Sequence, residues 1–512
     1  MTPESLVRTL EEFLASARDA QVIEDGAVVF DFADAKYSVS GEHNKCLLHF
    51  WSAERNVVRR VLDAQIKNDV LRFLVQRLGQ NKPTKIEICR QRDGRTASAK
   101  HQHRLTYART LKIIIGRHFS EYTITDLRTS MDLERSFGPI YTRGLIKRGQ
   151  SAFALIGINH EESQASVDAI LSFAILWLDL CRHVQAARCV VEGVKIFVPP
   201  GGSSLVRERM ACLSQAAAKW ELYELNQREH SAVRVDLADR GNLATRLVQF
   251  TQPQAAYERF SSAVACIREL MPECEVVALS PAELGFRRFG LEFARARLEY
   301  EYGSLRATAQ IVFGLGAAEQ KLTEKNRSEF ARLVQSIGEV RHPEGPRDHI
   351  LWRMHPERWL ESLVVRNLHP LDQQLAAGSP VYSQVPAFSA SDRAMIDVLT
   401  CTRQGRLLVA ELKADEDIHL PLQGLDYWAR VCWHHQRGEF QKFGYFPGIE
   451  LSPEPPLLLL VAPALHVHPA TDTILRYVSP AIPWTLVGID EHWREAIKPV
   501  FRKRSTPAAR VA

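Results

Sequence analysis

The sequence lacks the features that would set it apart from ordinary globular proteins. Its 512 residues contain no tandem repeat, no low-complexity tract and no apolar run long enough to cross a bilayer. The most apolar stretch, AILSFAILWLDL, covers only residues 169–180. The N-terminal residues have the pattern of an amphipathic helix with acidic side chains rather than that of a signal peptide. We therefore expect a cytoplasmic protein without a membrane partner.

Cysteine is scarce, and it is scattered along the chain. The nine cysteines include no Cys-x-x-Cys pair, which favours reduced thiols and argues against structural zinc or an iron–sulfur cluster. The Gly-rich stretch VPPGGSS at residues 198–204 has no Walker lysine, and no helicase or ATPase motif is present elsewhere. Any motor that this protein works with would be a separate helicase or ATPase partner.

Acidic residues are underrepresented in one part of the chain. Residues 51–150 contain 21 Lys and Arg against 9 Asp and Glu, although the net charge of the whole chain is only +5. Such an asymmetry indicates a face that binds a polyanion, the alternative being an ordinary solvated surface. The stretch from Arg90 to Arg109 lacks apolar periodicity and is predicted to be a mobile basic loop that contacts nucleic-acid phosphates. Its candidate binding residues are Arg92, Arg95, Lys100 and Arg104.

The length predicts several domains, and the pattern of elements divides the chain into four segments. Residues 1–115 are expected to form a basic α+β domain that binds nucleic acid, with a basic helix from about Glu54 to Leu78. Residues 116–250 alternate strands with helices and predict an α/β domain of unknown role. Residues 251–345 are expected to be mainly helical. Residues 346–505 form the C-terminal domain.

The C-terminal segment has a regular order of elements. From HPERWLESLVVRNL to WTLVGI, residues 355–489, the patterns predict helix, strand, strand, strand, helix, strand, helix and strand. This order predicts a mixed sheet with helices on its faces, so the overall fold class is α/β.

One strand of this segment carries charges that need an explanation. In LLVAELKADED, residues 407–417, Glu411 and Lys413 are two residues apart and therefore point to the same face of the sheet. If the preceding hairpin turns at Gln404, Asp397 lies directly opposite Glu411. Two carboxylates that face each other across adjacent strands destabilise a sheet unless a cation lies between them. Oxygen ligands of this kind suit Mg²⁺, with Mn²⁺ as an alternative.

These residues resemble the core of the PD-(D/E)XK nuclease superfamily. Asp397 followed by Glu411 and Lys413 is similar to its D-x(n)-E-x-K motif, and Glu361 on the upstream helix stands where members often place a glutamate. Ile396 replaces the proline of the family name, and the cluster cysteines of some RecB-like nucleases are missing.

The downstream helix extends the resemblance, which covers residues 348–503, about the last third of the chain. Gln423 and Tyr427 match the Q-x-x-x-Y motif of RecB-like members, and the layout is also similar to the nuclease domain of NucS-type mismatch endonucleases. The alternative to Asp397 as the hairpin aspartate is Asp392, which precedes the strand.

The resemblance implies a fold, an activity and a role for each residue. The fold would be restriction-endonuclease-like, and the activity a Mg²⁺-dependent hydrolysis of DNA phosphodiester bonds in repair or in defence against foreign DNA. Asp397, Glu411 and Glu361 would hold the metal, and Lys413 would orient the attacking water or stabilise the charged phosphate. Gln423 and Tyr427 would position the nucleic-acid strand or Lys413.

Two other functions stay open at this stage. The C-terminal domain could be a degenerate relative that binds nucleic acid without cutting it, or the enzyme could cleave RNA, because nothing in the motif recognises a sugar. The sequence also leaves room for a homodimer.

Overall fold

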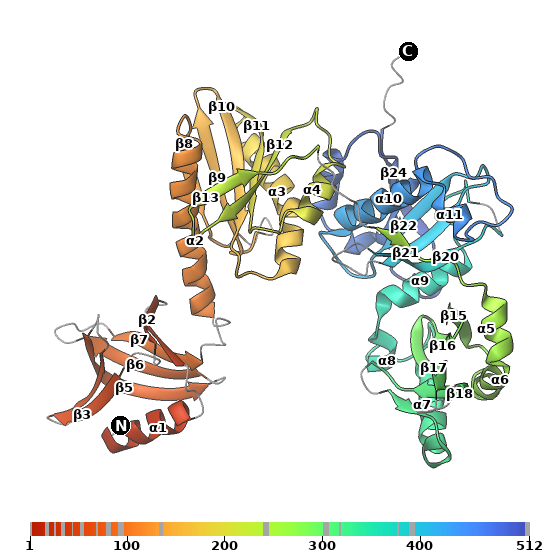
Figure 1. Cartoon of the computed structure of the whole chain (residues 1–512), viewed down its shortest axis with the longest axis horizontal. Coiled ribbons are helices and arrows are strands. Elements are labelled where there is room, and N and C mark those ends of the chain that lie inside the picture. Colours follow the sequence, from red (N-terminus) through yellow and green to blue (C-terminus); the bar gives the residue numbers. More distant parts are fainter. Residues whose placement is uncertain are drawn as a thin grey trace. The chain divides into compact units, whose positions relative to one another are not determined.

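The computed structural model describes most of the chain as two compact units. One consists of residues 1–203 and 221–235, and the other of residues 204–220 and 236–512. The described part contains sheets of seven, six, five and seven strands (Figure 1). The protein is mixed α/β as expected, and strand β14 (Arg246–Leu247), from the predicted segment 116–250, joins the C-terminal sheet. The described residues are 3–15, 20–24, 27–31, 36–42, 45–51, 56–67, 70–77, 83–90, 97–132, 137–238, 245–300, 307–316, 319–375, 378–388 and 395–506.

The N-terminal sheet is antiparallel, with strand order β2-β1-β7-β6-β5-β4-β3. Helix α1 covers it, because Leu6, Leu10 and Phe13 lie on one helical face and pack into the sheet core. The elements are α1 (Pro3–Ala15), β1 (Ala20–Glu24), β2 (Ala27–Asp31), β3 (Lys36–Glu42), β4 (Lys45–Trp51), β5 (Asn56–Lys67), β6 (Val70–Arg77) and β7 (Pro83–Arg90).

The basic helix predicted from Glu54 to Leu78 is wrong, because this stretch forms the antiparallel strands β5 and β6. Leu71, Phe73 and Val75 are buried at every second position, which is the period of a strand, and they contribute to the core beneath α1. Several arginines of the segment are also paired. Arg59 makes two bonds to Glu24, at 2.6 and 2.8 Å, and Arg72 contacts Glu87 at 2.9 Å.

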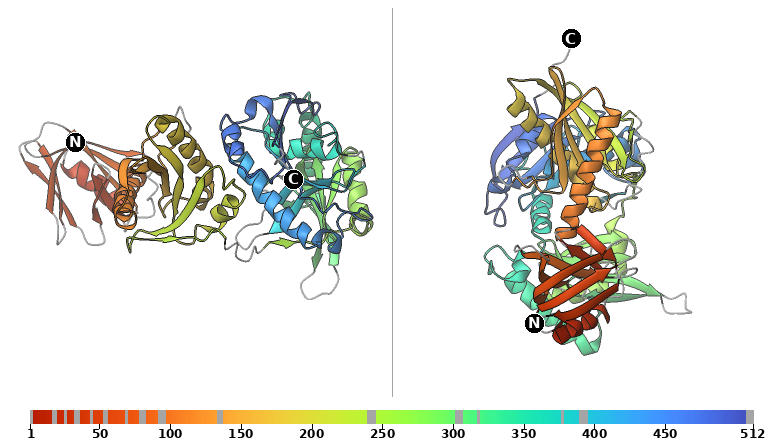
Figure 2. Two further views of the ribbon diagram at one scale, coloured as in Figure 1. Left: turned by 90° about the horizontal axis from the view of Figure 1, so that it is seen from above. Right: turned by 90° about the vertical axis from the view of Figure 1, so that its left-hand side faces the viewer.

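The second sheet has the order β13-β12-β11-β10-β9-β8 and is mixed, since β10 and β11 are parallel while β9 and β10 are antiparallel. Helix α2 packs on one face and α3 on the other (Figures 1 and 2). The elements are α2 (Ala97–His118), β8 (Thr123–Arg128), β9 (Tyr141–Arg148), β10 (Ser151–Ile158), α3 (Gln164–Gln185), β11 (Val190–Val198), β12 (Lys219–Asn226) and β13 (Ser231–Arg234).

The mobile loop predicted from Arg90 to Arg109 is wrong for residues 97–109, which belong to α2. Tyr107, Leu111 and Ile115 follow one another at four-residue spacing and are buried against the sheet, so tertiary packing stabilises this helix. Arg104 is 13% exposed and pairs with Glu162 at 2.6 Å. Lys100 lies in the first turns of α2, whereas Arg92 and Arg95 lie outside the described residues.

By length and composition alone, one described helix could cross a membrane. This is α3, whose 22 residues include the stretch that seemed too short for a span. Half of its most apolar window is buried within the fold, and Trp177 donates a hydrogen bond to the carbonyl of Gly144 in β9 at 2.8 Å. The described structure therefore uses α3 as a core helix. The cytoplasmic location stays a prediction.

The segment predicted to be mainly helical contains a five-stranded antiparallel sheet in addition to its helices. In β16 and β17, Phe286 and Phe293 are buried in the core of this sheet, while Arg287 and Arg295 pair with Glu292 on the other face. The elements are α5 (Pro253–Arg259), α6 (Ser261–Leu270), β15 (Glu275–Ser280), β16 (Glu283–Arg288), β17 (Leu291–Tyr300), β18 (Ala307–Phe313), β19 (Gln320–Lys321) and α7 (Arg327–Val340).

The C-terminal sheet contains every element predicted for it, in the predicted order. Its strand order is β14-β20-β21-β22-β23-β24-β25; β22, β23 and β24 are parallel, and the other pairs are antiparallel. Helices α9 and α10 cover opposite faces (Figure 1). The elements are β14 (Arg246–Leu247), α8 (Ile350–Arg353), α9 (Pro356–Arg366), β20 (Tyr382–Phe388), β21 (Met395–Cys401), β22 (Leu407–Leu412), α10 (Leu420–Gln436), α11 (Glu439–Lys442), β23 (Leu457–Pro463), α12 (Thr471–Arg476), β24 (Trp484–Ile489) and β25 (Pro499–Arg504).

Two buried arginines fix the helices that flank the C-terminal sheet. Arg341 is fully buried, donates to the carbonyls of Leu351 at 2.8 Å and Phe289 at 3.0 Å, and lies 4.4 Å above the Trp359 ring. It thereby ties the turn between β16 and β17 to α9. Helix α4 (Ser204–Met210) holds α10 through Arg209, whose guanidinium lies 2.6 Å from Asp426. Both helices that carry predicted site residues are thus anchored from outside the sheet.

Candidate active site

The hairpin of β21 and β22 has the register that the sequence predicted. Val398 pairs with Ala410, Leu399 with Val409 and Cys401 with Leu407, which centres the turn on Gln404. One further step in this register places Asp397 opposite Glu411. Because β22 is buried along its whole length, Glu411 is shielded from bulk water, whereas Asp397 on β21 is partly exposed and lines a cavity.

Asp397 and Glu411 are crowded and largely dehydrated. Asp397 Oδ2 accepts a hydrogen bond from the backbone N–H of Leu412 at 3.0 Å. Glu411 is 1% exposed, and its Oε2 atom is buried without a hydrogen-bond partner. Burial raises the pKa of Glu411 well above its usual value, and the charge of Asp397 raises it further. Burial likewise raises the pKa of Asp397. An unsatisfied buried carboxylate oxygen of this kind is the ligand that a hard cation requires.

Lys413 lies on the same side as Glu411 and is surrounded by acids. Its Nζ atom is 3.2 Å from Glu411, 3.6 Å from Glu357 and 3.8 Å from Asp417, and the side chain is 13% exposed. Burial alone would lower the pKa of Lys413, but the three carboxylates outweigh it and leave the pKa above its usual value. Lys413 is therefore positively charged at neutral pH. Its distance of 3.2 Å from Glu411 supports the predicted convergence of Asp397, Glu411 and Lys413.

Glu361 reaches the same cleft from α9 but is held by other groups. Its Oε2 atom accepts from Arg358 at 3.1 Å and from Gln384 at 2.8 Å. Burial raises the pKa of Glu361 to about 7. Gln384 also donates to Asp397 Oδ1 at 3.4 Å, so it links the two carboxylates. Its φ of +51° is unusual for a residue other than glycine and marks a constrained position.

Helix α10 lies directly against Glu411. A Cβ atom at Gly424 would be 2.5 Å from Leu460 and 3.6 Å from the Cβ of Glu411, so only glycine permits this approach. Gln423 and Tyr427 flank Gly424 on α10, and the Oε1 atom of Gln423 is buried without a partner. Burial raises the pKa of Tyr427, and the charges of Glu411 and Asp397 add to the shift. The tyrosine of the predicted motif is therefore close to the carboxylates.

A cavity of about 350 Å³ opens at Asp397 and Glu361. Most of its lining residues are polar or charged, and they include residues that the sequence analysis did not single out. Glu357 precedes Glu361 by four residues on α9, so helical spacing could have indicated that both side chains reach the same side. Asp417 contacts Lys413 but is not one of the lining residues. Gln384 had no such signal. The lining residues are His355, Pro356, Glu357, Arg358, Glu361, Asp397 and Asp415.

The predicted three-carboxylate metal site is only partly assembled. Among the residues that the structure describes, no group of three or more His, Cys, Asp or Glu side chains is arranged to hold a metal ion. Asp397 and Glu411 face each other, whereas Glu361 binds Arg358 and Gln384 instead. The donor set still fits Mg²⁺, which often takes one or two carboxylates and completes its shell with water and phosphate. Asp392, the alternative aspartate, lies outside the described residues.

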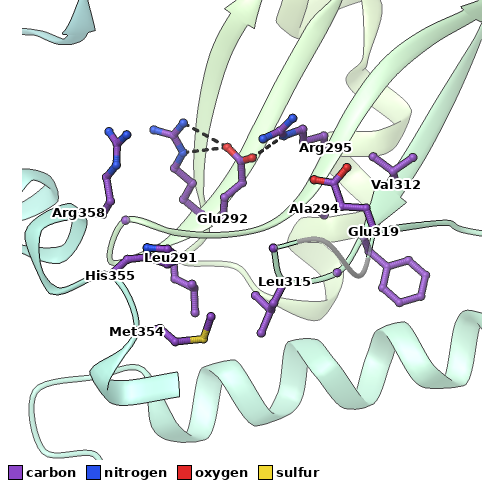
Figure 3. Close-up of a pocket in the computed structure, with 15 residues that line it drawn as sticks. Leu291, Glu292, Ala294, Arg295, Val312, Leu315, Glu319, Met354, His355 and Arg358 are labelled. Carbon is purple, nitrogen blue, oxygen red and sulfur yellow. Dashed lines mark hydrogen bonds and ion pairs between the residues drawn. The ribbon is translucent and has the colours of Figure 1, made fainter. Parts of the chain in front are cut away.

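A second cavity, of about 270 Å³, adjoins the first at His355 and Arg358. It is drawn in Figure 3, which shows Glu292 bonded to Arg295. Arg287 contacts the same glutamate at 3.1 Å, so the two β-strand arginines share one counter-charge. The side chain of Arg358 is 43% exposed between the two cavities.

Comparison with models of known families, with curated proteins and with solved structures finds no match to this chain.

Proposed function

We propose that the protein is a divalent-metal-dependent nuclease that hydrolyses phosphodiester bonds of DNA, in repair or in defence against foreign DNA. The observation that carries this proposal is the cluster of Asp397, Glu411 and Lys413 beside a cavity that Asp397 lines: Lys413 Nζ lies 3.2 Å from Glu411, and Asp397 accepts from the backbone N–H of Leu412, the residue between them. This arrangement is the one expected of a restriction-endonuclease-like domain, and the resemblance to PD-(D/E)XK nucleases rests on the same residues.

Asp397 and Glu411 would hold Mg²⁺ or Mn²⁺, since both present oxygen atoms and Glu411 has one that nothing else in the described structure satisfies. When bound, such an ion would supply charge neutralisation at the phosphate and a more acidic water. Lys413 is placed to donate hydrogen bonds from Nζ to the attacking water or to a phosphate oxygen. Gln384 and Glu361 fix the orientation of Asp397, and α10 excludes water from the far side of Glu411.

Metal binding can be tested without an activity assay. Adding Mg²⁺ to the metal-free protein should raise its melting temperature in a saturable way, because the ion binds only the folded site. Asp397→Asn should abolish this effect while keeping an acceptor for the Leu412 N–H. Glu495→Gln, an exposed substitution, serves as the control and should keep the full response. An unchanged response in Asp397→Asn would exclude Asp397 as a ligand.

Activity is tested by incubating the purified full-length protein with single-stranded, duplex and mismatched DNA and with RNA, over a range of Mg²⁺ and Mn²⁺ concentrations. We expect metal-dependent cleavage of DNA that disappears with a chelator. Cleavage of RNA alone would show that the substrate is RNA and not DNA. Tight binding to DNA, with no cleavage at any metal concentration, would favour a non-catalytic nucleic-acid-binding protein.

A further inference from the structure

A large aromatic cavity lies next to the candidate active site and has no role in the chemistry described so far. Its volume is about 610 Å³, within the range of small-molecule sites. Phe250, Tyr382 and Tyr445 form its aromatic cluster, with ring centroids 5.0 to 5.5 Å apart. Tyr257 adds a further ring from α5. The cavity lies between β15, an edge strand, and β20 of the C-terminal sheet.

The polar groups of these tyrosines already have partners. The hydroxyl of Tyr257 donates to the carbonyl of Val276 at 2.8 Å, and that of Tyr445 donates to Val248 at 2.9 Å. The hydroxyl of Tyr382 accepts from the N–H of Phe446 at 2.8 Å. Tyr382 and Tyr445 are 7% and 4% exposed and form the floor of the cavity, while Phe250 and Tyr257 are half-buried and offer ring surface to a flat, π-rich group.

The cavity adjoins the carboxylate site. Gln384 lines it and donates to both Glu361 and Asp397. Arg358 lines this cavity, the carboxylate cavity and the cavity of Figure 3. Arg287 stands beside it and is shared by two of the three. A ligand with a flat ring in the aromatic part would place an attached anionic group at the arginines, beside Asp397.

We propose that the aromatic cavity accepts the base of an unpaired nucleotide whose phosphate neighbours the bond that is cut. The proposal rests on the proposed nuclease function and narrows its substrate to single-stranded DNA or to duplex DNA with an unpaired nucleotide at the cut. A base that remains paired and stacked in a duplex cannot enter such a cavity. Aromatic rings that stack on bases accept every base, so no sequence preference is expected.

The test fills the cavity. Val276 and Ala278 face the core of the five-stranded sheet, so the alternation of β15 turns Val277 and Leu279 into the cavity. Val277→Trp and, as a second variant, Leu279→Trp would occupy the space of the base. Leu279 is 37% exposed, and its replacement should leave the fold intact. The control is Val500→Trp, on an exposed position of edge strand β25.

Two quantities are measured on the full-length protein in the presence of Mg²⁺: the rate of cleavage and the fluorescence of a bound oligonucleotide. The wild type should cut a single-stranded oligonucleotide, or a duplex with one unpaired nucleotide, at least tenfold faster than the fully paired duplex. Val277→Trp and Leu279→Trp should slow cleavage of the single-stranded oligonucleotide and of the duplex with one unpaired nucleotide at least tenfold. Val500→Trp should leave both rates unchanged. The fluorescence of a single-stranded oligonucleotide that carries 2-aminopurine should be quenched by the wild type and the control but not by the two cavity variants.

The outcomes separate this inference from the nuclease proposal. Equal cleavage of paired and unpaired substrates, or quenching that survives in both cavity variants, would overturn the base cavity while leaving the nuclease standing. Quenching that depends on the cavity, without cleavage of any nucleic acid, would support the base cavity and overturn the nuclease. Absence of quenching by the wild type would overturn the inference whatever the cleavage result.

Discussion

Lys413→Ala should reduce metal-dependent cleavage by about 100-fold or more, the usual effect of removing a group that stabilises transition-state charge. The Nζ atom of Lys413 lies 3.2 Å from Glu411, and the raised pKa keeps it positively charged at neutral pH. The measurement is the single-turnover rate on a labelled DNA substrate at saturating Mg²⁺.

The control for this variant is Lys503→Ala, which removes a half-exposed lysine that pairs with Asp472 at 2.6 Å. It should cleave at the wild-type rate. The rise in melting temperature on adding Mg²⁺ should persist in Lys413→Ala, because Asp397 and Glu411 are unchanged. Wild-type cleavage by Lys413→Ala would show that the cutting arises elsewhere, and loss of the Mg²⁺ response would show that the lysine acts on metal binding.

Glu361→Gln should stabilise the metal-free protein at alkaline pH and leave its stability unchanged in acid. Burial raises the pKa of Glu361 from 4.5 to about 7, a difference worth about 3 kcal/mol. A carboxyl whose pKa is raised by folding stabilises the folded state while it is protonated. That contribution is complete below about pH 4.5 and is lost as the pH rises through about 7. Glutamine keeps an oxygen for Arg358 and cannot ionise.

The free energy of unfolding in urea, measured at pH 4.5 and pH 8 with a chelator, tests this expectation. Relative to the wild type, Glu361→Gln should gain up to about 3 kcal/mol at pH 8 and close to nothing at pH 4.5. Glu495→Gln, at an exposed position, should change neither value. A variant that is less stable than the wild type at pH 8 would mean that the ion pair with Arg358 outweighs the burial of the charge.

Local pattern was sufficient for the C-terminal hairpin and its neighbours. The alternation of LLVAELKADED placed Glu411 and Lys413 on one side, and the turn predicted at Gln404 set the register of Asp397 and Glu411. Strand register depends on turn position and on a period of two, both of which are properties of neighbouring residues. The same holds for the order of helices and strands from α9 to β24.

Local pattern gave the wrong secondary structure where the spacing of apolar residues is compatible with both a helix and a strand. The basic run that includes Arg59 and Arg60 carries apolar residues at spacings compatible with a helix, and the stretch with Phe286 and Phe293 does so too. Both form strands, because the neighbouring strands and the helices that cover them bury alternate residues. Arg104 shows the converse case, in which packing of Tyr107 and Leu111 produced a helix where no periodicity was apparent.

The sequence alone determined the candidate chemistry, because Asp397, Glu411 and Lys413 lie on two adjacent strands whose pairing is local. Only the tertiary structure decided what surrounds them. Glu357 and Glu361 reach the cavity because Arg341 anchors α9, and Gln384 joins the site from another strand with a backbone conformation that no sequence pattern announces. The aromatic cavity combines residues from β15, β20 and the chain before α5, more than a hundred positions apart, and such contacts depend on the packing of whole elements.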